Sequence, residues 1–244
     1  MSSGLYENYY NDFYKELSRL DEVGNTFKKV ENFLPILKGK EKILDIGCGH
    51  GGVSHELIKR CFEVWGLEIN DEAIKSLEHK GFKTLKRDIT KPLNINEKFD
   101  IILILDVLEH LFDPLFLLHQ AKNILNKKGV LIINVPLYFD ILDRIKILFT
   151  GSIISMDNLC YGKAIYKKFR SYNYDHIRFF RPKEVIEMGK SLGFKVDKIE
   201  YGTTGYFGKS KIIKLLIRLF INRYTVNINP NILAHSMKIR WRLD

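Results

Sequence analysis

The sequence predicts a doubly wound α/β domain, in which a mostly parallel sheet carries helices on both faces. Two observations support this prediction. Short runs of almost continuous apolar residues, such as IILIL and VLIINV, alternate with helix-like segments between residues 42 and 136, which is typical of parallel strands buried on both faces. The first apolar run also leads directly into a glycine-rich loop, GCGHGG, that is followed by a helix.

The elements follow one another in a regular order. Strands are expected at residues 42–46, 63–69, 83–89, 99–105 and 129–135, with helices between them at 53–60, 71–80 and 113–125. Asn70 or Asp71 can cap the second helix, because a short polar side chain accepts hydrogen bonds from the first free backbone N–H groups. The pattern is completed by a helix at 182–192, a strand at 194–201 and an extended stretch at 232–241.

The cysteine content argues against two classes of protein. The chain has three cysteines, with no C-x-x-C pair and no cysteine–histidine cluster, so neither a disulfide framework nor a structural zinc site is expected. A reducing, cytoplasmic setting follows. The N-terminus lacks the basic start and apolar core of a signal peptide, and the longest apolar runs fall short of the roughly 18 residues of a membrane-spanning helix.

The net charge of +10 is unevenly distributed. Residues 1–130 carry a net charge of −1, whereas residues 131–244 carry +11. A uniformly basic chain would favour a nucleic-acid partner. A neutral first half and a basic second half predict instead that one face only meets an anionic partner or surface.

The glycine-rich loop satisfies a dinucleotide-binding fingerprint, G-x-G-x-x-G, at Gly47, Gly49 and Gly52, and Glu68 lies at the end of the second strand. Asp45, two positions before the first glycine, distinguishes between ligands. A carboxylate there would repel a pyrophosphate and attract a cation. S-adenosylmethionine carries an ammonium and a sulfonium group, so Asp45 favours it. Glu68 would then hold the ribose hydroxyls, and Asp88 would accept a hydrogen bond from the adenine amino group.

Five motifs in series carry a family resemblance: LDIGCGHG, GLEIN, RDI, FDIILILDVLEHLFDP and GVLIINVP. In this order and spacing, residues 42–136 resemble class I S-adenosylmethionine-dependent methyltransferases, in particular the group that contains the ubiquinone-type O-methyltransferases. The resemblance implies a seven-stranded, Rossmann-like sheet whose last strand, here 232–241, is antiparallel. The cofactor-binding residues expected on this basis are Asp45, Gly47, Cys48, Gly49, Glu68, Ile69, Asp88, Ile89, Leu105 and Tyr10.

We expect residues 1–244 to form one methyltransferase domain. Its cofactor-binding core is residues 42–136. Residues 1–40, rich in tyrosine and phenylalanine at helical spacing, are expected to form a helical lid; the alternative is a hydrophobic stripe that packs on the edge of the domain. Residues 137–181 form a substrate-side insertion, and residues 202–231 form a basic amphipathic insertion before the last strand.

Two histidines are candidates for a catalytic base, because methyl transfer to a hydroxyl needs a group that removes its proton. His110 follows the fourth strand in DVLEHL, and His176 lies in YDHIRFF. The alternatives are that His110 and Glu109 orient the following helix, and that His176 is a partly buried structural residue. Tyr138 is a candidate for lining the acceptor pocket. No metal site is expected; the weaker alternative gathers Asp106, Glu109 and Asn134 around a cation.

The basic second half predicts an anionic or lipid-linked small acceptor, such as a glycan precursor or a polyprenyl quinone precursor. An apolar stretch with a basic stripe at Lys211, Lys214 and Arg218 suits peripheral contact with the inner face of a membrane, or else packs on the sheet edge with its lysines reaching to solvent. The rival hypotheses are a methyltransferase that acts on RNA or other nucleic acid and a non-catalytic protein that binds the same cofactor.

Overall fold

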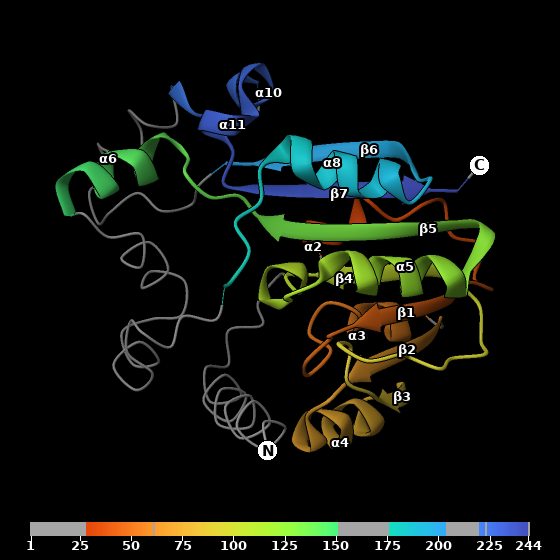
Figure 1. The fold of residues 1–244 in the computed structure, drawn as a ribbon. Coiled ribbons are helices and arrows are strands. Elements are labelled where there is room, and N and C mark those ends of the chain that lie inside the picture. Colours follow the sequence, from red (N-terminus) through yellow and green to blue (C-terminus); the bar gives the residue numbers. More distant parts are fainter. Residues whose placement is uncertain (1–27, 61, 151–175, 204–219, 223, 244) are drawn as a thin grey trace.

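The computed structural model describes residues 28–60, 62–150, 176–203, 220–222 and 224–243. Within this part of the chain, seven strands form one sheet in the order β3-β2-β1-β4-β5-β7-β6 (Figure 1). All neighbouring strands from β3 to β5 are parallel, and β7 is antiparallel to both β5 and β6. The strands are β1 Lys42–Ile46, β2 Glu63–Glu68, β3 Lys83–Lys86, β4 Phe99–Leu105, β5 Leu125–Pro136, β6 Lys195–Gly202 and β7 Ser236–Arg242. The predicted fold class is therefore confirmed.

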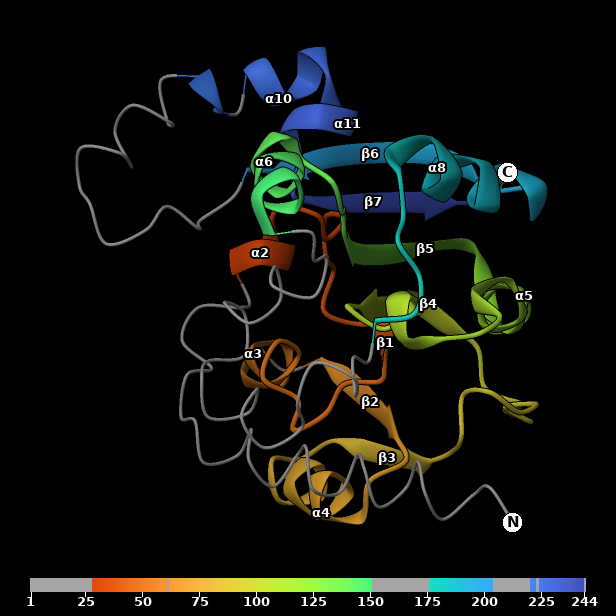
Figure 2. The same cartoon turned by 60° about the vertical axis from the view of Figure 1, so that its left-hand side comes forward.

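Helices cover both faces of the sheet (Figures 1 and 2). Alternate residues of β4 show this: Ile102 and Ile104 belong to the hydrophobic cluster that includes α5 and α8, whereas Ile101 and Leu103 belong to the cluster that includes α3 and α4. The longer helices are α3 His55–Lys59, α4 Asp71–His79, α5 Pro114–Ile124, α6 Ile141–Thr150 and α8 Pro182–Ser191. Shorter ones are α2 Lys28–Glu31, the 3-10 turn η1 Leu108–His110, α10 Thr225–Ile228 and α11 Pro230–Leu233.

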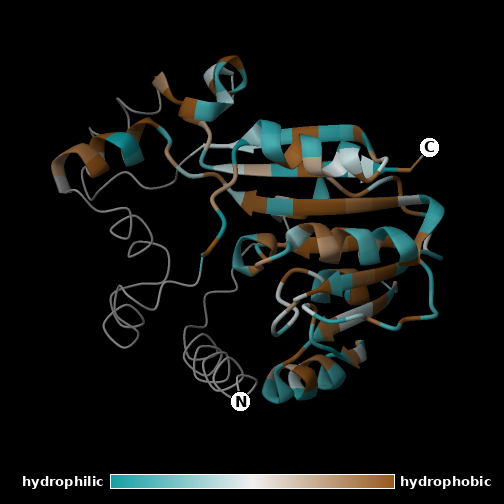
Figure 3. Ribbon diagram, viewed as in Figure 1, coloured by the Kyte–Doolittle hydropathy of each residue, from teal (hydrophilic) through white to brown (hydrophobic). Residues whose placement is uncertain are grey.

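Local sequence signals account for several of these boundaries. Asn70 caps α4 by accepting a hydrogen bond from the N–H of Ala73 at 2.8 Å, and Asp113 caps α5 through Phe116 at 3.0 Å. β5 is largely hydrophobic (Figure 3). Its residues Leu131 to Ile133 are fully buried, because β4 and β7 pair with its two edges and helices cover both faces of the sheet.

Three predicted strand boundaries need correction. β3 ends at Lys86, so Asp88 and Ile89 lie in the loop that follows it rather than in the strand. β5 begins at Leu125, four residues earlier than expected. β7 begins at Ser236, because Pro230 starts the short helix α11 where an extended stretch was expected.

The order of the strands places a topological switch point between β1 and β4. From β1 the chain proceeds outward through β2 and β3, and it then returns to build β4 and β5 on the other side of β1. In open α/β sheets, ligands bind in the crevice at the carboxyl ends of the strands beside such a point. The glycine-rich loop follows β1 and η1 follows β4, so both predicted parts of the site lie at this edge.

Candidate active site

The glycine-rich loop is held by close packing as well as by backbone conformation. Gly47 has a φ of +70°, and a Cβ atom placed there would lie 2.7 Å from a methyl carbon of Val107. Gly51, at φ +73°, would meet Leu77 and Phe82 at the same distance. Any side chain at Gly47 would therefore be strained and would also push against the segment that leads into η1. The glycine-rich loop therefore packs directly against the segment that follows β4.

Asp45 carries a carboxylate that is almost completely buried. Its side chain is 3% exposed and accepts a hydrogen bond from the Ser54 hydroxyl at 2.7 Å. Burial, together with the nearby negative charge of Glu68, raises the pKa of Asp45 to about 7, although the bond from Ser54 opposes this shift. A cationic ligand beside Asp45 would stabilise its ionised form, so the position fits an ammonium or sulfonium group.

Glu68 connects β2 to the glycine-rich loop. It is 4% exposed and accepts hydrogen bonds from three backbone N–H groups, those of Gly49 at 3.0 Å, Ile69 at 2.8 Å and Asn70 at 3.2 Å. A carboxylate offers about four acceptor positions. Holding both hydroxyls of a ribose would therefore require Glu68 to give up at least one of these backbone contacts. We call Asp45, Gly47, Gly49 and Glu68 the glycine-loop site.

The structure describes all but one of the other predicted cofactor residues. Burial tends to raise the pKa of Asp88, but hydrogen bonds from Thr90 and the charge of Lys91 outweigh it and lower the pKa overall. Cys48 has a thiol pKa raised well above its usual range, first by burial and then by Asp45 and Glu68, so it is a poor nucleophile. Leu105 ends β4, and Tyr10 lies outside the described residues.

Asp106, the residue after β4, adopts a left-handed backbone conformation with φ +55°. Two hydrogen bonds hold it to β5: its N–H donates to the carbonyl of Asn134 at 3.0 Å, and the Asn134 amide donates to its carboxylate at 2.5 Å. These bonds fix the direction in which the chain leaves β4. They therefore help to place η1, which carries the next predicted residues.

The two candidate histidines, which are distant in the sequence, lie side by side in the structure. The ring centroids of His110, in η1, and His176 are 4.6 Å apart, with the rings at 75° to each other. The Tyr138 hydroxyl shares a hydrogen bond with Nδ1 of His176, and the Glu109 side chain is 1% exposed. Each of Glu109, His110 and His176 has one atom that could bind a metal ion, and these three atoms lie within 4.8 Å of one another. We call Glu109, His110, Tyr138 and His176 the histidine cluster.

Backbone hydrogen bonds join the two segments that bring the histidines together. The carbonyl of Glu109 accepts from the N–H of Ile177 at 2.9 Å and from that of Arg178 at 3.0 Å. The Arg178 guanidinium also donates to the carbonyl of Leu111 at 3.2 Å and to that of Phe112. These contacts connect η1 to the segment around residue 176, and they pre-organise the histidine cluster.

The two histidines differ in their surroundings. His176 is 7% exposed, and burial, with a smaller contribution from the positive charge that His110 can carry, lowers the pKa of His176 to about 3. His176 is therefore neutral at physiological pH. His110 is half-buried. Of the two, His110 has better access to solvent and to an acceptor.

Several structural partners of the predicted residues have no signal in the sequence. Ser54, the partner of Asp45, carries no motif of its own. The contact between Tyr138 and His176 joins the end of β5 to a segment beyond the insertion, and no spacing in the sequence predicts it. The weaker hypothesis that Asp106, Glu109 and Asn134 share a cation is not favoured by the geometry, since the described residues place Glu109 with the two histidines instead.

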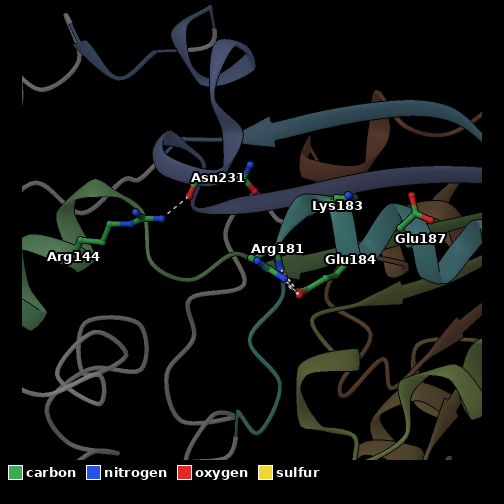
Figure 4. A pocket seen from close by; sticks show the side chains of 6 residues that line it. All are labelled: Arg144, Arg181, Lys183, Glu184, Glu187 and Asn231. Atoms are coloured by element: carbon green, nitrogen blue, oxygen red, sulfur yellow. Dashed lines mark hydrogen bonds and ion pairs between the residues drawn. The ribbon is translucent and has the colours of Figure 1, made fainter.

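A separate cavity of about 490 Å³ lies between α6, α8 and α11 (Figure 4). Arg181 pairs with Glu184, three residues further along the chain at the start of α8, with the shorter N···O distance at 2.5 Å. Arg144 donates to the carbonyl of Asn231 at 3.4 Å. None of the predicted site residues lines it. Its walls are formed by Arg144, Arg181, Lys183, Glu184, Glu187 and Asn231.

No helix among the described residues has the length and apolar character needed to cross a membrane. Several large apolar side chains are nevertheless exposed on α6, namely Ile145, Leu148 and Phe149, and others are exposed near α10, namely Phe220, Tyr224 and Ile228.

Comparison with known proteins identifies related sequences and folds. A family model described as a methyltransferase domain matches residues 18–199. A ubiquinone biosynthesis O-methyltransferase of Pelagibacter ubique is 26% identical over 164 residues, which cover 65% of this chain and 63% of that relative. An uncharacterized protein of Methanocaldococcus jannaschii is 31% identical over 188 residues, covering 68% of this chain and 80% of its own length.

Solved structures extend the likeness of fold along the whole chain. A methyltransferase of Archaeoglobus fulgidus that depends on S-adenosylmethionine superposes with a TM-score of 0.58 at 20% identity, covering 94% of this chain and 98% of its own. The magnesium protoporphyrin IX methyltransferase of Synechocystis, solved with bound S-adenosylhomocysteine, gives a TM-score of 0.61 at 13% identity and covers all of both chains. At these identities the likeness concerns the fold alone.

Proposed function

The chain belongs to the class I methyltransferases that use S-adenosylmethionine as their cofactor, and we propose that it transfers the methyl group to a hydroxyl oxygen of a small acceptor. The observation that carries this proposal is the histidine cluster at the carboxyl end of β4. It lies beyond Val107, which packs against Gly47. A base next to the cofactor loop is needed for a hydroxyl acceptor and is less necessary for an amine with a free lone pair.

In the proposed reaction each part of the site has a distinct task. When bound, S-adenosylmethionine supplies a methyl group on a positively charged sulfur. Asp45 stabilises the positive charge of the cofactor, and Glu68 binds its ribose. His110, held beside the neutral His176, removes the acceptor proton as the acceptor oxygen forms its bond to carbon. The S–CH3 bond breaks at the same time, and the electron pair returns to sulfur. Alignment of the two partners supplies most of the rate.

For the acceptor, we propose an anionic or lipid-linked small molecule, such as a glycan precursor or a polyprenyl quinone precursor. Three things support this: the +11 charge of residues 131–244, relatives named ubiquinone biosynthesis O-methyltransferases, and the exposed apolar side chains of α6, where Leu148 and Phe149 are 78% and 82% exposed. An apolar face beside basic residues suits peripheral contact with the inner face of the cytoplasmic membrane. The basic stripe at Lys211, Lys214 and Arg218 lies outside the described residues.

Liposome flotation tests this membrane contact. We expect the protein to float with vesicles that contain anionic lipid and to remain with the soluble fraction when the vesicles are neutral. A Leu148→Ser, Phe149→Ser double variant should float less well than the unmodified chain. Absence of flotation with either lipid would remove the membrane contact from the proposal and leave the methyl transfer unaffected.

Two rival functions are tested more simply. An RNA methyltransferase would bind RNA with an affinity that falls steeply as salt concentration rises, because phosphate contacts release counterions. A non-catalytic protein would bind the cofactor without turning it over. The deciding assay follows the release of S-adenosylhomocysteine with phenolic, sugar and lipid-linked hydroxyl acceptors and with RNA. We expect release with at least one hydroxyl acceptor and its loss in His110→Ala.

A further inference from the structure

The donor atoms of the histidine cluster suit a metal ion as well as a proton. Two imidazoles and one carboxylate, from His110, His176 and Glu109, meet within 4.8 Å of one another. Ligands of one zinc ion, each about 2.1 Å from the metal, lie at most roughly 4.2 Å apart. Small rotations of these side chains would therefore bring all three to a common cation. The set is also the one found at catalytic zinc sites that leave a position open for a substrate or water.

Neighbouring contacts hold these three side chains in fixed positions relative to one another. Glu109 and His110 are adjacent in a single turn of 3-10 helix, and the backbone bonds from Ile177 and Arg178 to Glu109 fix the distance to His176. The oxygen of Tyr138 can accept the Nδ1 proton of His176, which would fix the tautomer of this imidazole. Metal-binding histidines commonly have such a partner on the second ring nitrogen.

From this geometry we infer that Glu109, His110 and His176 bind a divalent cation of the zinc class, which activates the acceptor hydroxyl. Imidazole ligands favour Zn²⁺ and its transition-metal neighbours, whereas Mg²⁺ and Ca²⁺ prefer sites made only of oxygen. The inference rests on the proposed function and changes the task of the two histidines within it. They act as ligands, and the cation draws electron density from the acceptor oxygen.

The reaction remains balanced with this cation in place. The acceptor hydroxyl binds at the open position of the metal, and its O–H bond breaks with release of a proton to solvent, because a bound cation lowers the pKa of an oxygen ligand. The resulting oxygen anion forms a bond to the methyl carbon as the S–CH3 bond breaks. The metal keeps its charge throughout, so no oxidant or reductant is consumed.

Metal binding is tested first without any acceptor. A tag-free chain is stripped with EDTA, and Co²⁺ is added while visible absorption is recorded, followed by competition with Zn²⁺ and with Mg²⁺. We expect one Co²⁺ site per chain, displaced by Zn²⁺ and not by an equal concentration of Mg²⁺. Glu109→Gln, His110→Ala and His176→Ala should each weaken Co²⁺ binding at least tenfold. Unchanged Co²⁺ binding in all three variants would overturn the inference.

A second group of potential ligands in the described chain supplies the matched control. Asp140, Asp143 and His235 also bring donor atoms within 4.8 Å of one another, but two contacts there have a structural role: Asp140 accepts hydrogen bonds from the first turn of α6, at Leu142 and Asp143. His235→Ala should therefore leave Co²⁺ binding unchanged. Loss of binding in His235→Ala alone would place the cation at this second group and contradict our assignment.

Thermal shift and activity measurements then test whether the cation takes part in methyl transfer. Each variant should keep the thermal shift caused by S-adenosylmethionine, which shows that it is folded. With a hydroxyl acceptor that supports turnover, the stripped enzyme should be inactive and should recover with Zn²⁺ or Co²⁺. Full activity of the stripped enzyme, together with loss of activity in His110→Ala, would reject the cation and keep the histidine base. If neither stripping nor His110→Ala alters the rate, both the cation and the histidine base are wrong.

Discussion

The two halves of the candidate active site lie at the same edge of the sheet but are built in different ways. The glycine-loop site comes from consecutive elements, β1, the loop after it and β2. The histidine cluster draws its members from η1, from the residues after β5 and from a segment beyond residue 175. The cofactor half is therefore specified by short-range sequence pattern, whereas the acceptor half depends on long-range packing.

The two halves also differ in their charge and chemistry. The glycine-loop site presents two buried carboxylates, Asp45 and Glu68, which suits a cationic cofactor. The histidine cluster combines a buried carboxylate with two imidazoles and a phenol, which suits proton removal or metal binding. A substitution whose contacts are confined to one half should therefore alter either cofactor binding or acceptor activation and leave the other unchanged.

Gly47→Ala should damage both halves at once, because Gly47 packs against Val107 in front of η1. We expect loss of measurable cofactor binding, by calorimetry, and of methyl transfer. Gly39→Ala is the matched control: Gly39 has a similar φ of +81°, but nothing lies within 4 Å of an added Cβ. It should cost only about 1–2 kcal/mol of stability from backbone strain. Equal effects of the two substitutions would show that the packing at Val107 has no role.

Asp45→Asn should weaken the binding of S-adenosylmethionine about 10- to 150-fold, since it removes a charge-assisted contact worth about 1.5 to 3 kcal/mol. The amide can still accept the hydrogen bond from Ser54, so the fold should be preserved. Calorimetric titration with the cofactor measures the change, and Co²⁺ binding at the histidine cluster serves as the control for the other half. Unaltered cofactor affinity would show that Asp45 has been assigned the wrong task.

The affinity for the cofactor should also depend on pH. Because the pKa of Asp45 is raised to about 7 in the protein without ligand, most molecules carry a neutral Asp45 at pH 6 and an ionised one at pH 8. A cation binds the ionised form, so affinity should be about tenfold lower at pH 6 than at pH 8. The same titration with Asp45→Asn corrects for ionisation of the cofactor amine. An identical pH profile in both proteins would contradict the predicted role of Asp45.

Tyr138→Phe should have the smallest effect and should be confined to the acceptor half. Loss of the hydrogen bond to His176 is worth about 0.5 to 1.5 kcal/mol, which corresponds to a two- to tenfold lower turnover. Cofactor affinity should stay the same, because the hydrogen bond that is lost joins Tyr138 to His176, within the histidine cluster. A drop in cofactor affinity with normal turnover would reverse the expected assignment.

The sequence specified most of the cofactor half because its signals are local. The ends of β1 and β4, the cap at Asn70 and the carboxylates Asp45 and Glu68 all follow from a short apolar run and the polar residue after it. The late start of β7 was not predicted, because Pro230 can begin a helix as readily as it can interrupt a strand.

The histidine cluster was predicted only in part. The type and position of His110 and His176 marked each as a candidate, but their contact depends on Arg178 and on the backbone bonds to Glu109. Such contacts arise when the chain closes and have no periodicity in the sequence. For the same reason, the grouping of Glu109 with both histidines could not be read from spacing, and a metal site was not expected.

The separation between cofactor binding and acceptor activation is tested most directly by His110→Ala. One sample is used for calorimetric titration with S-adenosylmethionine and for a single-turnover assay with a hydroxyl acceptor. We predict that the affinity for the cofactor stays within twofold of the unmodified protein while methyl transfer falls at least a hundredfold, in line with the usual contribution of a general base or a catalytic metal. Unchanged methyl transfer at unchanged affinity would contradict it.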